Sequence, residues 1–244
     1  MTEPIGPPHR SVLRMVVLAG RDIAAEAARA EAILASRSNL HDPYIADLGL
    51  IDEILPIGDT PVQLLQPLMP ISRVHRWLER NDGDAGYLVV IQTEDAEGIV
   101  SRCARAGVRV TFDGRFGESR VLQLHAGDIG ILVEIDQMPD LNTWHWPPAE
   151  GQGVAAELLA VDCVVPDPQR SAGLLAEVLG IAGHDGGELL RFDHRELRFH
   201  RGEVSGIRAF DLRLTDPSAA ERAFTLCGTE VRLIHGDITE SGAR

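Results

Sequence analysis

Four times along the chain, a run of β-branched and aliphatic residues ends at an aspartate and passes directly into an alanine-rich helical pattern. The apolar positions alternate with period two before the aspartate and recur at helical spacing after it, which predicts a strand followed by a helix. Each aspartate can accept the free amides of the first helical turn. One structural unit is therefore predicted to occur four times. The four aspartates are Asp22, Asp95, Asp167 and Asp216.

Further strands are predicted after three of the copies. Three pairs of alternating or apolar segments read as hairpins: residues 50–59 with 60–68, 119–125 with 130–137, and 188–193 with 196–202. A short amphipathic helix is predicted at residues 71–80, with Ile71, Val74 and Leu78 on one side. The fourth unit ends after a strand at residues 229–234, which leaves no room for its last strand.

The order of strand, helix and strands predicts two domains. It occurs twice within residues 11–137, which predicts one domain built from two similar halves. Residues 138–153 are rich in Pro, Gly and polar residues and predict a linker. Residues 154–238 repeat the plan in shorter form and predict a second, shortened domain. A chain of 244 residues is long enough for both.

Composition narrows the partners and the compartment. A formal net charge of −14 argues against binding to the phosphate backbone of nucleic acid. The N-terminal MTEPIGPPHR lacks the apolar core of a signal peptide, and no later stretch approaches the apolar length that spans a bilayer. Cys103, Cys163 and Cys227 lie in apolar patterns without CxxC spacing, which predicts buried thiols. We therefore expect a cytoplasmic protein with neither nucleic acid nor membrane as its partner.

Three phrases carry a resemblance to a known family: GDTPVQLLQPL, GYLVVIQTEDAEGIVSRCARAGVRV and LHAGDIGILVEID. Within the duplicated arrangement, they resemble the vicinal oxygen chelate (VOC) superfamily. It includes glyoxalase I, extradiol dioxygenases, fosfomycin and bleomycin resistance proteins, and methylmalonyl-CoA epimerase. Residues 11–137 are most similar to the epimerase branch, and the whole chain is similar to two-domain glyoxalase-like bacterial proteins. The resemblance implies an α+β fold in which tandem βαβββ modules pair into a cupped mixed sheet with helices on its outer face.

The resemblance also implies where a metal would be held. VOC proteins hold it with side chains from the first and last strands of each half, usually two His and two carboxylates or a Gln. These positions fall on Met15, Gln63, Leu88 and Glu134. A thioether is a soft ligand and Leu has no lone pair, so we expect no cofactor, with a weakly bound divalent metal at Gln63 and Glu134 as the alternative. The third module has Ala160 at this position, so we expect no metal site in the C-terminal domain.

Alternation along the strands predicts a mostly apolar pocket in the first cup, with Gln63, Gln92 and Glu134 as its polar groups. A desolvated Glu134 holds its proton more tightly and is the candidate catalytic acid or base. The non-catalytic alternatives are that Glu134 remains from an ancestral ligand position without a catalytic role, and that Gln63 and Gln92 are solvated. His125 has a structural alternative too, as a turn residue. The candidate substrate-binding residues are Met15, Gln63, Leu88, Gln92 and His125.

Several other side chains are expected to be structural. Tyr87 should point away from the face of Leu88, against a helix. Trp144 and Trp146 should pack the linker against a domain edge, with an aromatic lip over the cup as the alternative. His194 and His200, which are interleaved with basic and acidic residues, predict a mixed-charge solvated face.

These observations favour a small-molecule enzyme of the isomerase or lyase kind, acting on a carbonyl-containing or CoA-linked metabolite through Glu134. The alternative is a non-catalytic protein that binds and sequesters a hydrophobic or aromatic compound, as resistance proteins of the superfamily do. A purely structural role is the third reading and best describes the C-terminal domain. Its unfinished sheet leaves unpaired strand groups, for which a homodimer is one solution.

Overall fold

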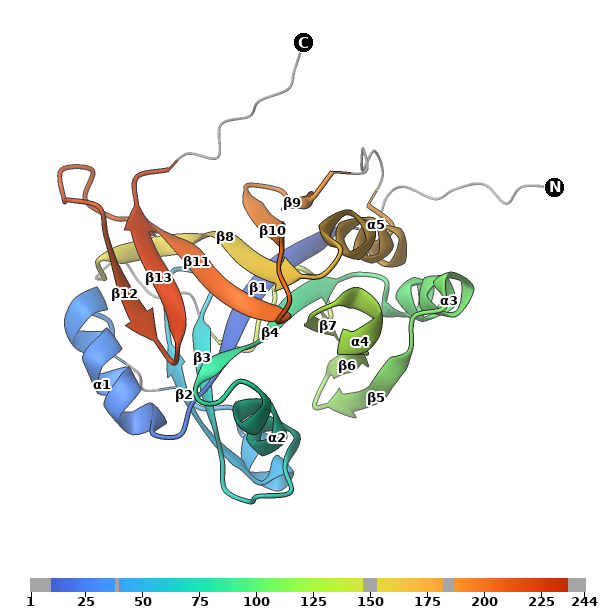
Figure 1. Cartoon of the computed structure of the whole chain (residues 1–244), viewed down its shortest axis with the longest axis horizontal. Coiled ribbons are helices and arrows are strands. Elements are labelled where there is room, and N and C mark those ends of the chain that lie inside the picture. Colours follow the sequence, from blue (N-terminus) through green and yellow to red (C-terminus); the bar gives the residue numbers. More distant parts are fainter. Residues whose placement is uncertain (1–9, 38–39, 147–152, 182–186, 237–244) are drawn as a thin grey trace, which may run out of the picture.

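The computed structural model describes residues 10–37, 40–146, 153–181 and 187–236. Within these ranges the strands form two mixed sheets (Figure 1). The strand order is β2-β3-β1-β4-β7-β6-β5 in the first sheet and β12-β13-β11-β8-β10-β9 in the second.

The bounds of the elements follow the chain. The first sheet contains β1 (Ser11–Ala19), β2 (Leu50–Leu55), β3 (Val62–Pro67), β4 (Ala85–Thr93), β5 (Val110–Phe116), β6 (Ser119–Leu124) and β7 (Leu132–Gln137). The second contains β8 (Ala155–Val165), β9 (Leu189–Phe192), β10 (Arg195–Arg201), β11 (Gly206–Leu214), β12 (Arg222–Leu226) and β13 (Thr229–Ile234). The helices are α1 (Ile23–Leu34), the 3-10 helix η1 (Ile45–Leu48), α2 (Arg73–Arg80), α3 (Ala96–Ala106), α4 (Ala126–Ile129) and α5 (Pro168–Leu179).

All four units share one strand arrangement. In each, the first strand lies beside the last and runs parallel to it, as β1 does with β3, β4 with β7, β8 with β10, and β11 with β13. The second unit has all four strands, whereas in the first unit the second strand is reduced to an isolated bridge between Leu40 and Ile54. The α+β fold of tandem βαβββ modules is therefore confirmed, with three of the units shortened.

Three of the predicted helix caps are confirmed. Asp22 accepts the amide of Ala25 at 3.1 Å, Asp95 that of Gly98 at 2.8 Å, and Asp167 that of Arg170 at 3.2 Å. The amphipathic helix at 71–80 is also present, as α2 with Ser72 as its cap. Its apolar side consists of Val74 and Leu78, while Ile71 precedes the helix and is exposed, contrary to the prediction.

The helix expected after Asp216 is wrong. Asp216 accepts the amide of Ser218 at 2.8 Å in a turn, and residues 222–226 form β12 instead. A two-residue turn with positive φ at Cys227 (42°) and Gly228 (68°) joins β12 to β13, so pairing with β13 overrides the local helical pattern. The fourth unit was also expected to lack its last strand, which is wrong. β13 pairs in parallel with β11, the position that the last strand has in the other three units. The fourth unit lacks its helix and one earlier strand.

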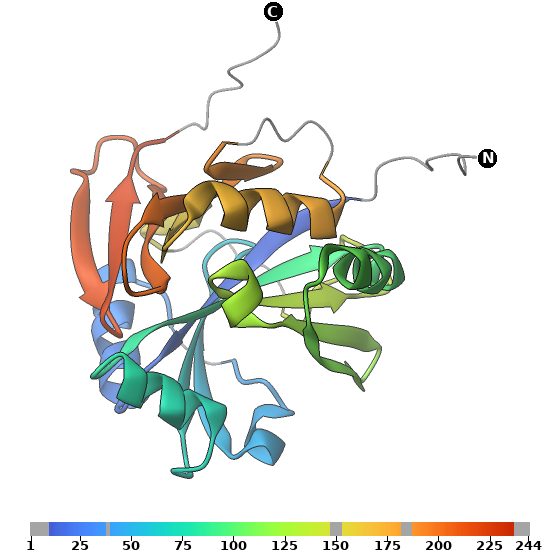
Figure 2. The ribbon, with the colours of Figure 1, turned by 45° about the vertical axis from the view of Figure 1, so that its right-hand side comes forward.

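The two faces of the first sheet bury different side chains. One face contributes Leu13 and Val89 to a hydrophobic core that also contains Val161 and Phe210 of the second sheet. Helix α5 of the third unit packs against α3 and α4 of the second unit (Figure 2). The opposite face belongs to a separate apolar cluster on the concave side of the sheet, which includes Met15 and Leu88 and is described below.

The central strands of the two sheets come close together at a glycine. A Cβ atom at Gly86 of β4 would lie 2.5 Å from the Cβ of Ile207 in β11, so only glycine fits this approach. The proposed domain limits, 11–137 and 154–238, stay a prediction, because sheet membership alone does not test whether each part folds separately.

Two further expectations can be compared with the structure. Cys103, Cys163 and Cys227 are buried and free, as predicted, and burial raises the pKa of each thiol. Across the described part of the chain, the helices are too short or too polar to cross a bilayer.

Candidate functional site

A cavity of about 390 Å³ opens on the concave side of the first sheet. Its wall brings together Met15, Gln63, Leu88 and Glu134, the four positions singled out by sequence. Residues from η1, the start of α2, β5 and the segment after β7 complete the wall. Tyr44 and Leu48 also line the cavity and are 36% and 51% exposed, so they mark its mouth.

Glu134 lies in the middle of β7, paired in the sheet with Val90 of β4 and Gln123 of β6. Its Oε2 accepts a hydrogen bond from Nε2 of Gln123 at 2.8 Å. Burial raises the pKa of Glu134 to about 8, and the neighbouring charge of Asp136 adds to the rise. The carboxyl therefore holds a proton at neutral pH and can exchange it near neutrality.

Asp136 follows Glu134 by two residues on the same face of β7 and also lines the cavity. Its Oδ2 lies 3.2 Å from Nε2 of His145, which comes from the segment after β7. Burial raises the pKa of Asp136, and contact with His145 opposes the rise. Its Oδ1 is buried and has no hydrogen-bond partner among the described residues. The cavity thus contains a second acidic group that the sequence analysis missed, although alternation along β7 placed it on the same face.

A third carboxyl, Asp42, also lines the cavity and is linked to Gln63 through Asp52. Nε2 of Gln63 donates to Oδ2 of Asp52 at 3.0 Å, and the backbone amide of Asp42 donates to the same oxygen at 2.9 Å. Burial raises the pKa of Asp42, and the Asp52 charge adds to the rise. One of the two N–H groups of the Gln63 amide is therefore engaged, and its carbonyl oxygen remains as an acceptor.

The side chains present do not fit a tightly bound metal ion. At the four ligand positions, Met15 and Leu88 are 4% exposed apolar residues of the concave-face cluster, and Gln63 and Glu134 are each engaged in a hydrogen bond. Over the described ranges, no three His, Cys, Asp or Glu side chains are grouped as a metal would require. Gln63 and Glu134 offer two oxygen ligands, too few for a structural or catalytic site.

Tyr87 faces the cavity, contrary to the expectation from alternation. The register between β1 and β4 shifts between Val17 and Leu18, which are paired with Leu88 and Gly86, so Tyr87 sits in a β-bulge. It lines the cavity beside Leu88, and its ring also packs edge-on against Trp77 of α2 with centroids 5.8 Å apart. Burial raises the pKa of Tyr87 to about 12, so its hydroxyl stays protonated.

Aromatic rings form much of the remaining wall. Phe112 and Phe116 of β5 stack with centroids 5.7 Å apart, and Tyr44 lies 5.4 Å from Phe116. Trp144 and Trp146 both pack against the concave-face cluster, and Trp146 also lines the cavity, which supports the aromatic-lip alternative for Trp146. Phe112 and Phe116 were not predicted as site residues, even though a spacing of four residues in a strand puts both on one face.

Gln92 and His125 are not among the residues that line this cavity, and their assignment to substrate binding stays a prediction. Nε2 of Gln92 donates to the carbonyl oxygens of Asp140 and Thr143, each at 2.9 Å. Nδ1 of His125 accepts the amide of Gly127 at 3.1 Å and caps the short α4, which matches the structural alternative. Gln92 is on the strand predicted to line the cup, but beyond the end of the pocket, where it binds the chain leaving β7.

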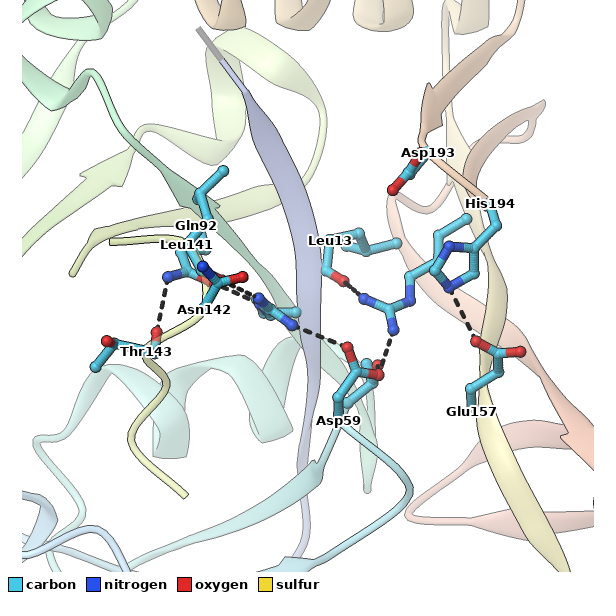
Figure 3. Close-up of polar contacts among 12 residues, drawn as sticks. Leu13, Asp59, Gln92, Leu141, Asn142, Thr143, Glu157, Asp193 and His194 are labelled. Atoms are coloured by element: carbon cyan, nitrogen blue, oxygen red, sulfur yellow. Dashed lines mark hydrogen bonds and ion pairs between the residues drawn. The ribbon is translucent and has the colours of Figure 1, made fainter. Parts of the chain in front are cut away.

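A polar network holds the segment that carries His145 and Trp146 (Figure 3). Arg14 donates through Nε to Gln92 at 2.6 Å, through Nη2 to the carbonyl of Leu141, and through Nη1 to Asp59 at 2.9 Å. Asp59 also pairs with Arg195 of the second sheet, whose Nη1 donates to the Leu13 carbonyl at 3.0 Å. Arg14 therefore links the contact between the two sheets, through Asp59, to the segment that forms part of the cavity wall, through Leu141.

The second sheet has charged pairs where the first has its cavity. In the first sheet, Val17 lies opposite Gln63 on the neighbouring strand. At the corresponding place in the third unit Asp162 lies opposite Arg198, and in the fourth unit Asp211 lies opposite Arg232. Arg198 donates to Asp211 at 2.8 Å and Arg232 to Asp211 at 2.6 Å. His200 lies 2.9 Å from Asp162. His194 and His200 are about half exposed, as expected for a mixed-charge solvated face, but Asp162 and Asp211 are buried, so this part of the prediction is wrong. Both carboxylates are paired with guanidinium groups.

Comparison with known proteins gives likeness of fold. No family model and no curated protein sequence matches the chain. Among solved structures, a hypothetical protein from Staphylococcus aureus is similar over 92% of this chain and 99% of that one, with a TM-score of 0.65 and 11% identity. A variant of methylmalonyl-CoA epimerase from Streptomyces coelicolor, in complex with 2-nitronate-propionyl-CoA, covers 53% of this chain and 98% of that one, with a TM-score of 0.47 and 22% identity. The Mycobacterium tuberculosis methylmalonyl-CoA epimerase covers 53% and 89%, with a TM-score of 0.47 and 21% identity.

The likeness to the Staphylococcus aureus protein extends over nearly the whole chain, and at 11% identity it concerns the fold alone. The chain has the glyoxalase-like fold of tandem βαβββ modules that the sequence resemblance implies.

Proposed function

We propose that this protein is a small-molecule enzyme of the isomerase or lyase kind, which acts on a carbonyl-containing or CoA-linked metabolite without a tightly bound metal. The observation that carries the proposal is the carboxyl of Glu134, which lies in the wall of an apolar cavity with its pKa raised to about 8. A group with this pKa can both accept and donate a proton near neutral pH.

The proposed chemistry is proton transfer next to a carbonyl. As a carboxylate, Glu134 takes the proton on the α-carbon, the C–H electron pair moves into an enolate, and the same or a neighbouring carboxyl returns a proton. The enolate oxygen needs a donor that keeps its own proton. The Tyr87 hydroxyl meets this need, because it faces the same cavity and its pKa is raised to about 12. Gln63 is less suitable, since its amide nitrogen is bonded to Asp52.

The test is hydrogen exchange at the α-carbon. The purified protein is incubated in D₂O with a panel of α-branched acyl-CoA thioesters and simple ketones, and deuterium uptake is followed by mass spectrometry. For a compound that exchanges, Glu134→Gln should reduce the rate at least about 100-fold, the usual contribution of a general acid or base, while binding stays nearly intact. The matched control is Glu118→Gln, which changes an exposed carboxyl outside the cavity. Exchange that continues unchanged in Glu134→Gln would remove the proposal.

A second candidate is a non-catalytic protein that sequesters a hydrophobic or aromatic compound. The specific observation in its favour is the aromatic content of the cavity wall, where five rings come from Tyr44, Tyr87, Phe112, Phe116 and Trp146. A compound that binds in this cavity and is recovered chemically unchanged after long incubation supports sequestration over catalysis.

A further inference from the structure

The cavity combines three carboxyl groups with little positive charge. Asp42, Glu134 and Asp136 all line it. A carboxylate that is withdrawn from water is destabilised unless a cation or a full set of hydrogen bonds compensates for the lost hydration. Asp136 shows the deficit most directly, because its side chain is 6% exposed and its Oδ1 lacks a hydrogen-bond partner among the described residues.

The basic groups around the cavity do not remove this deficit. Arg73 lies at the exposed rim, where its Nη1 donates to Oε1 of Gln123 at 3.2 Å. His145 contacts Asp136 alone among the three carboxyls within hydrogen-bond distance. The whole chain carries a formal charge of −14, which attracts cations and repels anions. The titratable and charged residues that line the cavity are Asp42, Tyr44, Arg73, Tyr87, Glu134, Asp136 and His145.

The aromatic rings give the same site a second means of holding a positive charge. Phe112, Phe116 and Tyr44 form one group of neighbouring rings, and Tyr87 and Trp146 contribute to other parts of the wall. The faces of such rings attract organic cations, above all when the site is shielded from water. Carboxyl groups together with ring faces in one cavity of about 390 Å³ suit a cation that also has an apolar body.

We propose that the cavity binds an organic cation, namely a quaternary or protonated amine attached to an apolar or aromatic group. The proposal rests on the proposed function only in that the cavity takes a ligand, and it applies to a substrate and to a sequestered compound alike. Of the two substrate classes in the proposed function, it favours a carbonyl compound that carries a positive charge over a CoA-linked one, because a CoA thioester would bring several negative charges into a site lined by carboxyls. A bare metal ion is also disfavoured, because over the described ranges the His, Cys, Asp and Glu side chains are not grouped to ligate one.

The experiment compares ligands that differ in charge but not in shape. The intact protein is titrated at pH 7.5 with benzyltrimethylammonium, a permanent cation, and with neopentylbenzene, its neutral carbon isostere. Phenylacetate serves as the anionic comparison. Binding is followed by tryptophan fluorescence, which reports on Trp146 in the cavity wall, and by isothermal titration calorimetry. We expect the cation to bind at least about tenfold more tightly than the isostere, and phenylacetate to bind more weakly than both.

Variants then locate the binding site. Asp136→Asn and Phe112→Leu should each weaken the binding of benzyltrimethylammonium about tenfold or more and leave neopentylbenzene less affected. The matched control is Asp47→Asn, which removes the same charge from an exposed position in η1 outside the cavity wall. It should change the affinity less than about twofold. Should a variant fail to fold, the comparison of the three ligands on the natural chain still decides the question.

Three results would overturn the proposal. They are equal affinity for the cation and its isostere, an equal loss in Asp47→Asn and Asp136→Asn, and full displacement of the cation by millimolar MgCl₂ or MnCl₂ at constant ionic strength. The last result would show that the missing positive charge is a metal. None of these results depends on turnover. Selective binding of the cation, together with no deuterium exchange on any compound, would therefore contradict the enzymatic function and still support cation binding.

Discussion

The carboxyl of Glu134 lines a cavity that can hold a ligand, and it is also withdrawn from bulk water. Its one hydrogen bond in the described structure comes from the neutral amide of Gln123, and its nearest charge of note is another carboxyl, Asp136. Both features favour the protonated form over the carboxylate.

The raised pKa of Glu134 predicts how stability depends on pH. Its folded pKa is about 8, above the ordinary 4.5, so between these values the folded protein binds a proton that the unfolded chain releases. The contribution of Glu134 to stability is therefore present below pH 4.5 and lost as the pH rises to 8. Glu134→Gln, which stays neutral, should be more stable than the natural chain at pH 8 by at least about 1 kcal/mol, with little difference at pH 4.5. Urea unfolding at the two pH values measures this, and an equal difference at both would contradict it.

At the scale of elements, local sequence determined most of the fold. The alternation of apolar residues predicted the strands, and Asp22, Asp95 and Asp167 predicted the starts of three helices, because strand and helix periodicity and capping are local properties. The helix predicted after Asp216 is absent because residues 222–226 pair with β13 through a tight turn. A local pattern of alanines does not reveal this pairing.

The candidate site was harder to predict than the fold. Alternation found Gln63 and Glu134 because they lie on regular strands. It misplaced Tyr87 because a β-bulge inserts one extra residue and reverses the face of the side chains beyond it. His145 could not be placed at all, since it reaches Asp136 from an irregular segment. Contacts of this kind depend on tertiary packing, which the spacing of residues in the chain does not encode.

The difference between the true and the mistaken caps can be measured. Asp22→Ala removes the carboxylate that accepts the amide of Ala25 at the start of α1, and should lower the free energy of unfolding by about 1 kcal/mol. Asp216→Ala removes a turn contact to Ser218 at an exposed site, and should cost less than about 0.5 kcal/mol. Chemical unfolding of the two variants makes the comparison, and a larger loss in Asp216→Ala would contradict this account of the fourth unit.

At the scale of the whole molecule, the second sheet supports the first. Arg195, which is 1% exposed, reaches across to Asp59, and Asp59 also binds Arg14, whose other nitrogens hold Gln92 and the Leu141 carbonyl (Figure 3). Burial would raise the pKa of Asp59, but the charges of Arg195 and Arg14 outweigh burial and leave its pKa lowered. The second sheet thus fixes the segment that closes the cavity, while its own cup is filled by ion pairs.

Removing the charge of Asp59 should therefore affect both stability and the cavity. Asp59→Asn leaves the buried guanidinium of Arg195 without a carboxylate, and should cost about 2–3 kcal/mol, below the range for fully buried pairs because the Asp59 side chain is 41% exposed. It should also increase hydrogen exchange in residues 140–146. The control is Asp193→Asn, which removes an exposed partner of Arg10 and should cost less than about 1 kcal/mol. Equal losses in the two variants would contradict a role for the contact between the sheets.

The proposed chemistry depends on a cavity that keeps Glu134 protonated into the neutral range. This protonation can be followed by ¹³C NMR of the side-chain carboxyl in protein labelled at glutamate, with the Glu134 resonance assigned by its loss in Glu134→Gln. We expect a titration midpoint near pH 8 for this resonance. A midpoint near the ordinary 4.5 would contradict it, because Glu134 would then be a fully ionised group with no special capacity for proton transfer at neutral pH.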